Sequence, residues 1–497
     1  MSASRFLPLL VLLLLALPAA PEAEPPPVPE ALPPAVLRAA GALGVDPEDV
    51  SVFVADLADG SVRARWRADA PRVPASTLKL VTTFAALEGL TPAHRWRTEA
   101  WALGPVRDGV LDGDLLLRGT GDPWLVAEEF WKFLRGIRGA GIRRITGDLV
   151  VDGSAFALPE EDPGAFDGQP DRIYNLVPHP LLVNFTAVRF AFSPDPGGER
   201  VRVRTDPVLA NLEIVNRLGL ERRSCGGYQR GVAVHVEDER RRDRVLLEGR
   251  FPTDCERYML TRSVLRPESY AWGLFRLYWS QLGGSFEGGF RKGALPPEFV
   301  TEDPRTGRPV APDGDHLLHV HESRPLGDVV RLVNKYSNNV MTRHLFLTLG
   351  AERFGGPADR EKGDRALREV LAAQGIDTTG LVVDNPSGLT RAARISARQL
   401  GELLLAAWRS PYMPEFVSSL ALSGLDGTIS DRFAGAPEQG RMHLKTGTLD
   451  DVSAIAGYVQ THGDRRRAVV VLVNGPDAHR GLGEEVQDAL LSWVFRD

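Results

Sequence analysis

The sequence predicts an α/β protein in which both chain ends form one unit and a β-rich region is inserted between them. Alternating apolar and polar residues on either side of Asp59-Gly60 predict a hairpin over 50–67. Apolar runs predict two strands within 452–474, and helical periodicity follows over 484–495. Short β-like runs fill residues 98–320. We therefore expect the two ends to fold together around the inserted region.

Composition restricts the class of protein. The chain has 497 residues, which is enough for about three domain-sized units. Apolar residues make up 43% and charged residues 25%, as in globular proteins. The 59 Lys and Arg against 65 Asp and Glu give a net charge of −6 without a long basic run, which argues against a nucleic-acid partner. The chain has no phosphate-binding or dinucleotide fingerprint, and we expect no cofactor.

The N-terminus predicts export. Arg5 precedes an apolar run over 6–17, and small residues follow, which is typical of a secretory signal peptide over 1–23 with an undefined cleavage site. The run is shorter than the about 20 residues of a membrane span, although an uncleaved N-terminal anchor stays open. Residues 24–34 are proline-rich and predict an extended spacer.

A buried helix is expected after the hairpin. Leu78, Val81 and Ala85 recur at helical spacing up to Gly89, with apolar residues on most sides. Further helical periodicity appears over 326–349, 365–373 and 396–408.

The last helix is amphipathic, with Val486, Leu490 and Val494 on its apolar side. Because no basic face accompanies the apolar one, we expect packing on the terminal strands rather than a membrane-surface role.

Cys225 and Cys255 are the two cysteines of the chain. In an exported protein they are more simply one disulfide than a metal site, since zinc cages need four close ligands. Two buried free thiols are the alternative. His316, His319 and His321 alternate with apolar residues, so they predict a strand with structural or solvated histidines rather than metal ligands.

Ser76 and Lys79 are the first pair that can carry chemistry. Their three-residue spacing at a helix start places the hydroxyl and the ammonium on one face. A lysine can accept the serine proton if burial or a second cation lowers its pKa. Alone, this pattern is also that of a solvated Ser and Lys on an ordinary helix.

Two further motifs follow in order. Ser337-Asn338-Asn339 stands between apolar helical stretches and predicts a turn that projects into a cleft, although a surface cap would look the same. Lys445-Thr446-Gly447-Thr448 predicts a strand edge where Gly447 lets a substrate backbone approach, and Lys445 could be the second cation beside Lys79. The three motifs, in this order and context, argue against coincidence.

With these motifs the chain resembles the low-molecular-mass class C penicillin-binding proteins, D-alanyl-D-alanine carboxypeptidases and endopeptidases. Supporting stretches occur at 147–156, 184–185, 334–339, 387–391 and 426–433. The resemblance implies a penicillin-recognising, β-lactamase/transpeptidase-like domain. It would be formed by residues 35–97 and 321–497 and interrupted by two nested β-rich domains within 98–320.

The resemblance also implies roles for the motif residues. Ser76 would attack the substrate carbonyl and Lys79 would accept its proton. Ser337 would relay a proton and Asn339 would orient Lys79. Lys445 and Thr446 would bind the terminal carboxylate, beside Gly447, and the N–H groups of Ser76 and Thr448 would form the oxyanion hole.

Asp152 and Arg391 match positions that, in this family, contact a zwitterionic substrate side chain. For Asp152 the alternative is a carboxylate that caps a turn. Asp450, three positions after Gly447, is not expected to favour an acidic side chain.

The expected function is a serine-type carboxypeptidase/endopeptidase of peptidoglycan peptides that β-lactams acylate, in the periplasm or another extracytoplasmic location of a bacterium. A peripheral association with membrane or wall stays open. The alternatives are a catalytically idle wall-binding scaffold and, less favoured, a β-lactamase or esterase.

Overall fold

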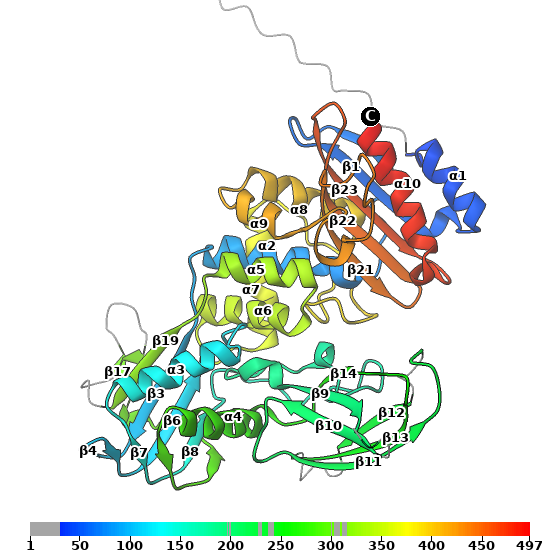
Figure 1. Ribbon diagram of the computed structural model, residues 1–497. Coiled ribbons are helices and arrows are strands. Elements are labelled where there is room, and N and C mark those ends of the chain that lie inside the picture. Colours follow the sequence, from blue (N-terminus) through cyan, green and yellow to red (C-terminus); the bar gives the residue numbers. More distant parts are fainter. Residues whose placement is uncertain are drawn as a thin grey trace, which may run out of the picture.

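The computed structural model describes residues 30–195, 197, 200–226, 231–236, 243–299, 301–302, 309–310 and 316–497. The signal peptide and most of the spacer predicted for 1–34 lie outside the described residues. Both ends of the described chain lie in one α/β unit, and the inserted region forms a second body below it in Figure 1. We call the first body the terminal unit and the second the insertion.

A six-stranded antiparallel sheet forms the centre of the terminal unit. Its strands lie in the order β2-β1-β23-β22-β21-β20. β1 pairs with β2 on one side and with β23 on the other, so the first and last strands of the chain are neighbours. This confirms the predicted hairpin and the union of the two ends. The bounds are β1 (Val50–Asp56), β2 (Val62–Trp66), β20 (Ala421–Leu422), β21 (Met442–Leu449), β22 (Val452–Gln460) and β23 (Arg466–Asn474).

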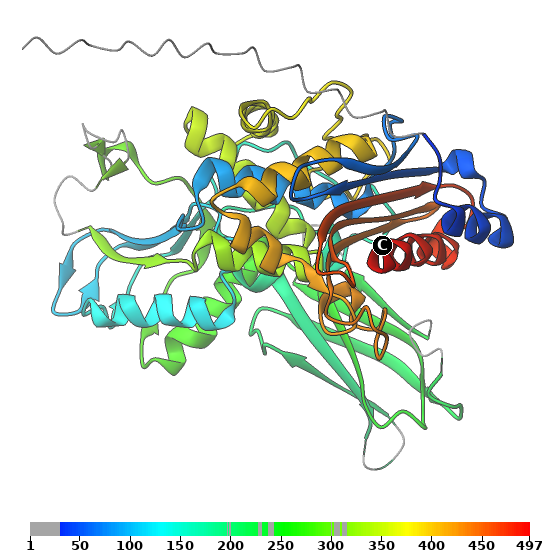
Figure 2. The ribbon, with the colours of Figure 1, turned by 90° about the horizontal axis from the view of Figure 1, so that it is seen from above.

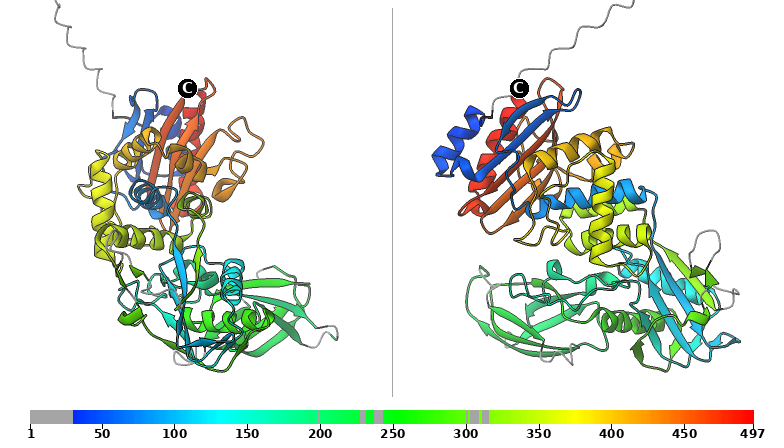
Figure 3. Two further views of the ribbon diagram at one scale, coloured as in Figure 1. Left: turned by 90° about the vertical axis from the view of Figure 1, so that its left-hand side faces the viewer. Right: turned by 180° about the vertical axis from the view of Figure 1, so that it is seen from behind.

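Helices cover both faces of this sheet (Figures 2 and 3). Alternate residues of β23 point to opposite faces of the sheet. Val469 and Val471 pack under the first and last helices, whereas Val470 and Leu472 pack under the helices on the other face. The outer pair is α1 (Pro34–Leu43) and α10 (Leu482–Arg496). The other face carries α2 (Lys79–Leu90), α5 (Leu326–Tyr336), α6 (Asn339–Phe354), α7 (Arg360–Ala373), α8 (Ala397–Arg409) and α9 (Met413–Ser419).

Two helix predictions are confirmed by this layering. α2 is buried from Lys79 to Leu87, as apolar residues on most of its sides indicate. The apolar side of α10 packs on the sheet through Val486, Leu490 and Val494, so that face is already occupied. Within the described residues, none of the helices has the length and apolar character that crossing a membrane requires.

The insertion begins with a five-stranded sheet in the order β16-β8-β6-β3-β19, flanked by a four-stranded sheet β15-β7-β5-β4. The larger sheet comprises β3 (Arg97–Leu103), β6 (Asp114–Gly119), β8 (Leu149–Asp152), β16 (Phe290–Lys292) and β19 (Leu317–Glu322). The smaller one comprises β4 (Val106–Arg107), β5 (Val110–Leu111), β7 (Arg144–Ile145) and β15 (Ser285–Phe286). A further two-stranded sheet pairs β17 (Thr301–Glu302) with β18 (Pro309–Val310).

Two helices in the insertion were not predicted. They are α3 (Ala127–Gly139) and α4 (Pro267–Gln281). The sequence of α3 does show helical periodicity, since apolar residues recur at helical spacing and are buried: Phe130, Phe133, Leu134 and Ile137. His319 and His321 of β19 lie against α3. His319 contacts the ring of Phe133, and His321 Nε2 is 3.5 Å from Glu129 Oε2.

Two three-stranded sheets complete the insertion. One has the order β10-β9-β14 and the other β11-β13-β12, and their apolar faces share a core with α3 and α4. The bounds are β9 (Ala187–Pro194), β10 (Val201–Asp206), β11 (Glu213–Glu221), β12 (Val232–Val236), β13 (Arg244–Pro252) and β14 (Tyr258–Ser263). A disulfide joins Cys225 and Cys255, whose Cα atoms are 4.8 Å apart, in the segments between β11 and β14.

Candidate active site

Ser76 lies in a single 3₁₀ turn, Ala75–Leu78, which leads directly into α2. Two glycines pack closely against this turn. A Cβ on Gly447 would lie 2.7 Å from Ser76 N, and a Cβ on Gly388 would lie 1.9 Å from Ala75 O. Gly388 also has a φ of +81°, which disfavours other residues. We predicted that Gly447 admits a substrate backbone. That role stays a prediction, and the contacts add a second one, since the glycine lets β21 pack against the serine turn.

Lys79 is fully buried and touches three oxygen atoms. Its Nζ lies 2.9 Å from Ser76 Oγ, 2.7 Å from Asn339 Oδ1 and 2.6 Å from the Ser387 carbonyl. Burial, and to a lesser extent the charge of Lys445, holds the pKa of Lys79 well below its usual range. Lys79 therefore gives up its proton to become a neutral amine more readily than an exposed lysine does.

The three contacts define where the lone pair of that amine points. A neutral amine has two N–H donors and one lone pair. The Asn339 and Ser387 oxygens can only accept, so they take the two N–H groups. In that neutral form the lone pair is left for the Ser76 hydroxyl, so the 2.9 Å contact in which a charged Lys79 donates to Ser76 Oγ would reverse and the hydroxyl would donate to Nζ. This is the arrangement that a base needs toward a serine nucleophile.

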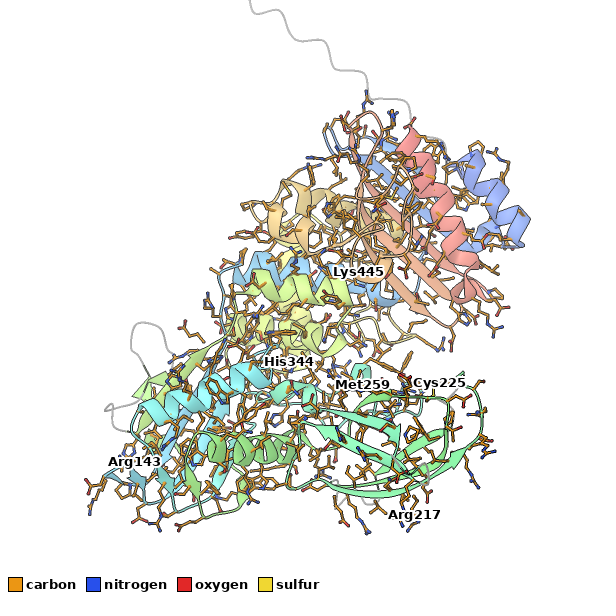
Figure 4. The ribbon with its side chains drawn as sticks, in the orientation of Figure 1. Arg143, Arg217, Cys225, Met259, His344 and Lys445 are labelled. Carbon is orange, nitrogen blue, oxygen red and sulfur yellow. A yellow bond between two sulfur atoms is a disulfide. The ribbon has the colours of Figure 1, made fainter. Side chains whose placement is uncertain are left out.

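A second hydroxyl and ammonium pair lies nearby. Ser337 ends α5 in the left-handed region, with a φ of +56°, and its hydroxyl accepts a hydrogen bond of 2.9 Å from Lys445 Nζ. Asn338 then caps α6 by accepting from Met341 N, so Ser337 and Asn338 form the turn between helices that the sequence predicts. Burial lowers the pKa of Lys445 to about 7. Figure 4 places Lys445 where the central sheet meets the helices.

The edge of β21 is open beside these groups. Its neighbour β20 pairs only with Leu444 and His443, so among the described strands none covers Lys445 to Leu449 on that side. An extended peptide can add to such an edge. Thr448 is exposed there and Thr446 is half-buried.

Thr428 is a site residue that we did not predict. Thr446 Oγ1 donates to Thr428 Oγ1 at 2.7 Å, which pairs the two hydroxyls at the β21 edge. The turn that carries Thr428 is held by the buried Lys335, whose Nζ lies 2.5 Å from Asp426 Oδ2. The stretch Asp426-Gly427-Thr428 supported the family resemblance, and no residue pattern pointed to its contact with Thr446.

A cavity of about 490 Å³ opens between the insertion and the terminal unit. Asn339, Ser387 and Arg391 line it, together with residues of the 158–177 segment of the insertion. Asn339 Nδ2 donates to the Tyr174 carbonyl at 3.0 Å, so the insertion contacts the site directly. Arg391 Nη2 forms an exposed ion pair with Asp450 Oδ2 at 2.9 Å.

Asp152 does not reach this cavity, which corrects its predicted role in substrate recognition. The carboxylate is buried at the end of β8 and accepts from Ser154 N at 2.8 Å and Leu295 N at 2.9 Å. These bonds satisfy both oxygens inside the insertion. The turn-capping alternative therefore describes Asp152.

The structure thus brings most predicted residues to one place. Ser76, Lys79 and Asn339 form one hydrogen-bonded group, and Ser337, Lys445 and Thr446 form a second. The remaining positions are distributed as follows: Gly447 and Thr448 continue the β21 edge, Arg391 lies at the cavity wall, and Asp152, Cys225 and Cys255 belong to the insertion.

Comparison with known proteins identifies the family. The model of the D-Ala-D-Ala carboxypeptidase 3 (S13) family matches residues 42–496. The chain belongs to this family. The predicted resemblance and the predicted enzyme class, a D-Ala-D-Ala carboxypeptidase, are confirmed by this match.

Individual proteins are similar to this chain over most of its length. A D-alanyl-D-alanine carboxypeptidase from an Actinomadura species is 28% identical, with 88% of this chain and 80% of that protein covered. The crystal structure of penicillin binding protein 4 from Haemophilus influenzae matches with a TM-score of 0.77 at 22% identity, covering 93% of this chain and 99% of that one. The same protein complexed with a novel β-lactam matches with a TM-score of 0.73 at 21% identity, with the same coverage. The predicted penicillin-binding α/β fold is confirmed by these likenesses.

Proposed function

We propose that this S13 protein removes the C-terminal D-alanine from peptidoglycan peptides through an acyl-enzyme on Ser76. We further propose that the same serine cleaves peptide cross-links and is acylated by β-lactams. The observation that carries the proposal is the contact of a buried Lys79 with Ser76, in which both N–H groups of a neutral amine are engaged elsewhere.

The first step forms a bond between Ser76 Oγ and the carbonyl carbon of the penultimate D-alanine. The hydroxyl proton moves to Lys79 Nζ, and the carbonyl π electrons move to oxygen. The N–H groups of Ser76 and Thr448 hold this oxyanion. The intermediate then expels the terminal D-alanine as its C–N bond breaks.

The leaving nitrogen needs a proton. Ser337 supplies this proton from its hydroxyl and is reprotonated from Lys79 and Lys445. The proton taken from Ser76 thus ends on the leaving amine. The 2.9 Å contact between Ser337 Oγ and Lys445 Nζ supports this relay. Water then attacks the ester carbon, releases the shortened peptide and restores the Ser76 hydroxyl.

Substrate binding follows the charges of the site. Lys445 attracts the terminal carboxylate, and the Thr446 hydroxyl donates to it once Thr446 accepts from Thr428 instead of donating to it. The substrate backbone adds to the open edge of β21. Arg391 lies at the cavity wall, where it would meet the substrate side chain, and Asp450 already pairs with it.

The export signal in the sequence and the peptidoglycan substrate together favour a location outside the cytoplasm of a bacterium.

Mass analysis of the intact protein after penicillin exposure tests the proposal. We expect one adduct on the unaltered protein and none on Ser76→Ala, together with D-alanine release from a peptide that ends in D-Ala-D-Ala. A protein with Ser76 intact that forms no adduct and releases no D-alanine would be the idle scaffold. An adduct that is hydrolysed within seconds would indicate a β-lactamase.

A further inference from the structure

The outer face of the sheet β10-β9-β14 is rich in arginine. Val201 and Val203 of β10 and Phe190 and Phe192 of β9 belong to the core, so the residues between them point outward. The strand register pairs the outward residues across the sheet as Arg202 with Ser193, Arg204 with Ala191 and Met259, and Asp206 with Arg189 and Thr261. Arg257, which directly precedes β14, lies beside Arg202 and Ser193. We call these residues the arginine face.

This face carries unbalanced positive charge. Arg189 lies 3.8 Å from Asp206, whereas Arg202, Arg204 and Arg257 make no ion pair in the part of the chain that the structure describes. Neighbouring strands are about 4.8 Å apart and alternate residues about 6.7 Å apart. The three guanidinium groups therefore lie within about one Debye length of each other, and each repels the other two. In a chain of net charge −6, such a cluster is suited to an anionic ligand.

The face is hollowed where the arginines gather. A depression of about 310 Å³ lies over Ala191 and Ser193, with Arg202, Arg204 and Arg257 around it. Glu256 is the acidic group in its wall. The arginines therefore surround a concave surface in which several carboxylates can be held together.

A second hollow of about 520 Å³ continues from the Arg189 end of the face. Arg189, Asp206 and Thr261 belong to both surfaces, and beyond them lie the half-buried rings of Trp131 on α3 and Tyr278 on α4. Indole and phenol rings offer a flat apolar surface together with a polar atom, which suits the faces of sugar rings. The two hollows thus place an arginine-lined end beside an end that carries two aromatic rings.

We propose that the arginine face binds the carboxylates of the peptides on a peptidoglycan strand whose sugar rings lie against Trp131 and Tyr278. This inference rests on the proposed function, because it assigns the insertion to the same polymer that the Ser76 site would cut. An anionic membrane would supply the negative charge but gives no reason for an aromatic hollow at the end of the face. Peptidoglycan supplies both chemistries on one chain.

The binding test uses Ser76→Ala as the background, so that no turnover occurs during sedimentation with purified peptidoglycan. The test variant carries Arg202→Gln, Arg204→Gln and Arg257→Gln. The matched control carries Arg107→Gln, Arg217→Gln and Arg250→Gln, which remove the same charge from exposed positions on other strands. In the view of Figure 4, Arg217 lies along the lower edge of the insertion, whereas Met259 of the arginine face lies along its upper edge.

We expect the test variant to bind roughly tenfold more weakly than the background at about 50 mM salt, since each exposed contact contributes a few-fold. The control should stay within about twofold, and binding by the background should fall steeply with salt. Peptidoglycan whose carboxylates have been amidated should bind the background as weakly as it binds the test variant. Trp131→Ala should weaken binding at low and high salt alike, because sugar stacking is not screened.

Equal binding of the test and control variants would overturn the proposal, as would undiminished binding of amidated peptidoglycan. The proposal would also be overturned if the test variant lost binding to phosphatidylglycerol vesicles but kept its binding to peptidoglycan. That result would make the face a membrane-binding surface. The same substitutions with Ser76 intact should still react with penicillin and release D-alanine from a soluble peptide, which shows that they fold. If the unaltered protein did neither but still bound peptidoglycan through this face, the proposed function would fail and this inference would stand.

Discussion

Gly388→Ala should strongly slow the acylation of Ser76 and should also lower the free energy of unfolding. The new Cβ would lie 1.9 Å from the Ala75 carbonyl oxygen, whereas ordinary contact needs about 3.4 Å, so the serine turn and the 387–389 loop must separate by about 1.5 Å. The Ser387 carbonyl holds Lys79 at 2.6 Å and moves with that loop. A displacement of this size at reacting groups costs about 100-fold in rate. The positive φ of Gly388 adds about 1–2 kcal/mol of strain in the folded state.

Gly380→Ala is the matched control for this experiment. Gly380 has a φ of +74°, close to that of Gly388, but nothing lies within 4 Å of the position its Cβ would take. Both variants should lose the stability that a positive φ costs, Gly388→Ala should lose about 1–3 kcal/mol more in thermal unfolding because of its overlap with Ala75, and only Gly388→Ala should lose acylation in stopped-flow assays with a fluorescent penicillin. If Gly388→Ala acylated within about threefold of the unaltered protein, or if both variants slowed equally, the packing of the glycine on the serine turn would not control the reaction.

Three further outcomes follow from the same geometry. Lys445 is charged below its pKa of about 7 and neutral above it, so kcat/KM for a peptide with a free terminal carboxylate should fall as pH rises through that value, while that of the corresponding carboxamide should not. Thr428→Val should raise KM for the carboxylate substrate about threefold to tenfold, since Thr446 loses the neutral hydroxyl that positions it, whereas Thr428→Ser and the nearby control Ser430→Ala should not; a rise in all three would refute the hydroxyl pairing. Asp152→Ala should lower the free energy of unfolding by about 2 kcal/mol, because Leu295 N and Ser154 N lose their acceptor, and should leave KM unchanged; a raised KM with normal stability would restore its predicted role in recognition.

The residues that carry the proposed reaction could be predicted because, within each short motif, they lie close together in the sequence. Ser76 and Lys79 are adjacent on one helical turn, and Lys445 to Thr448 occupy consecutive positions of one strand. Thr428 could not be found in this way. Its contribution depends on the pairing of β20 with β21 and on the Lys335–Asp426 ion pair, which join positions far apart in the chain. Asp152 was misplaced for the complementary reason, since an Asp at a strand end looks the same whether it binds a substrate or caps a turn.

The insertion contacts the proposed active site through the amide of Asn339. Asn339 can present either its oxygen or its NH₂ group to Lys79, and the two orientations differ chemically. The Tyr174 carbonyl of the insertion can only accept, so it takes the NH₂ group and leaves Oδ1 facing Lys79 Nζ. In the opposite orientation the NH₂ group would donate to the lone pair of a neutral Lys79, and the Ser76 hydroxyl would lose its base. The contact of the insertion with Asn339 therefore selects the orientation in which Lys79 can accept the serine proton.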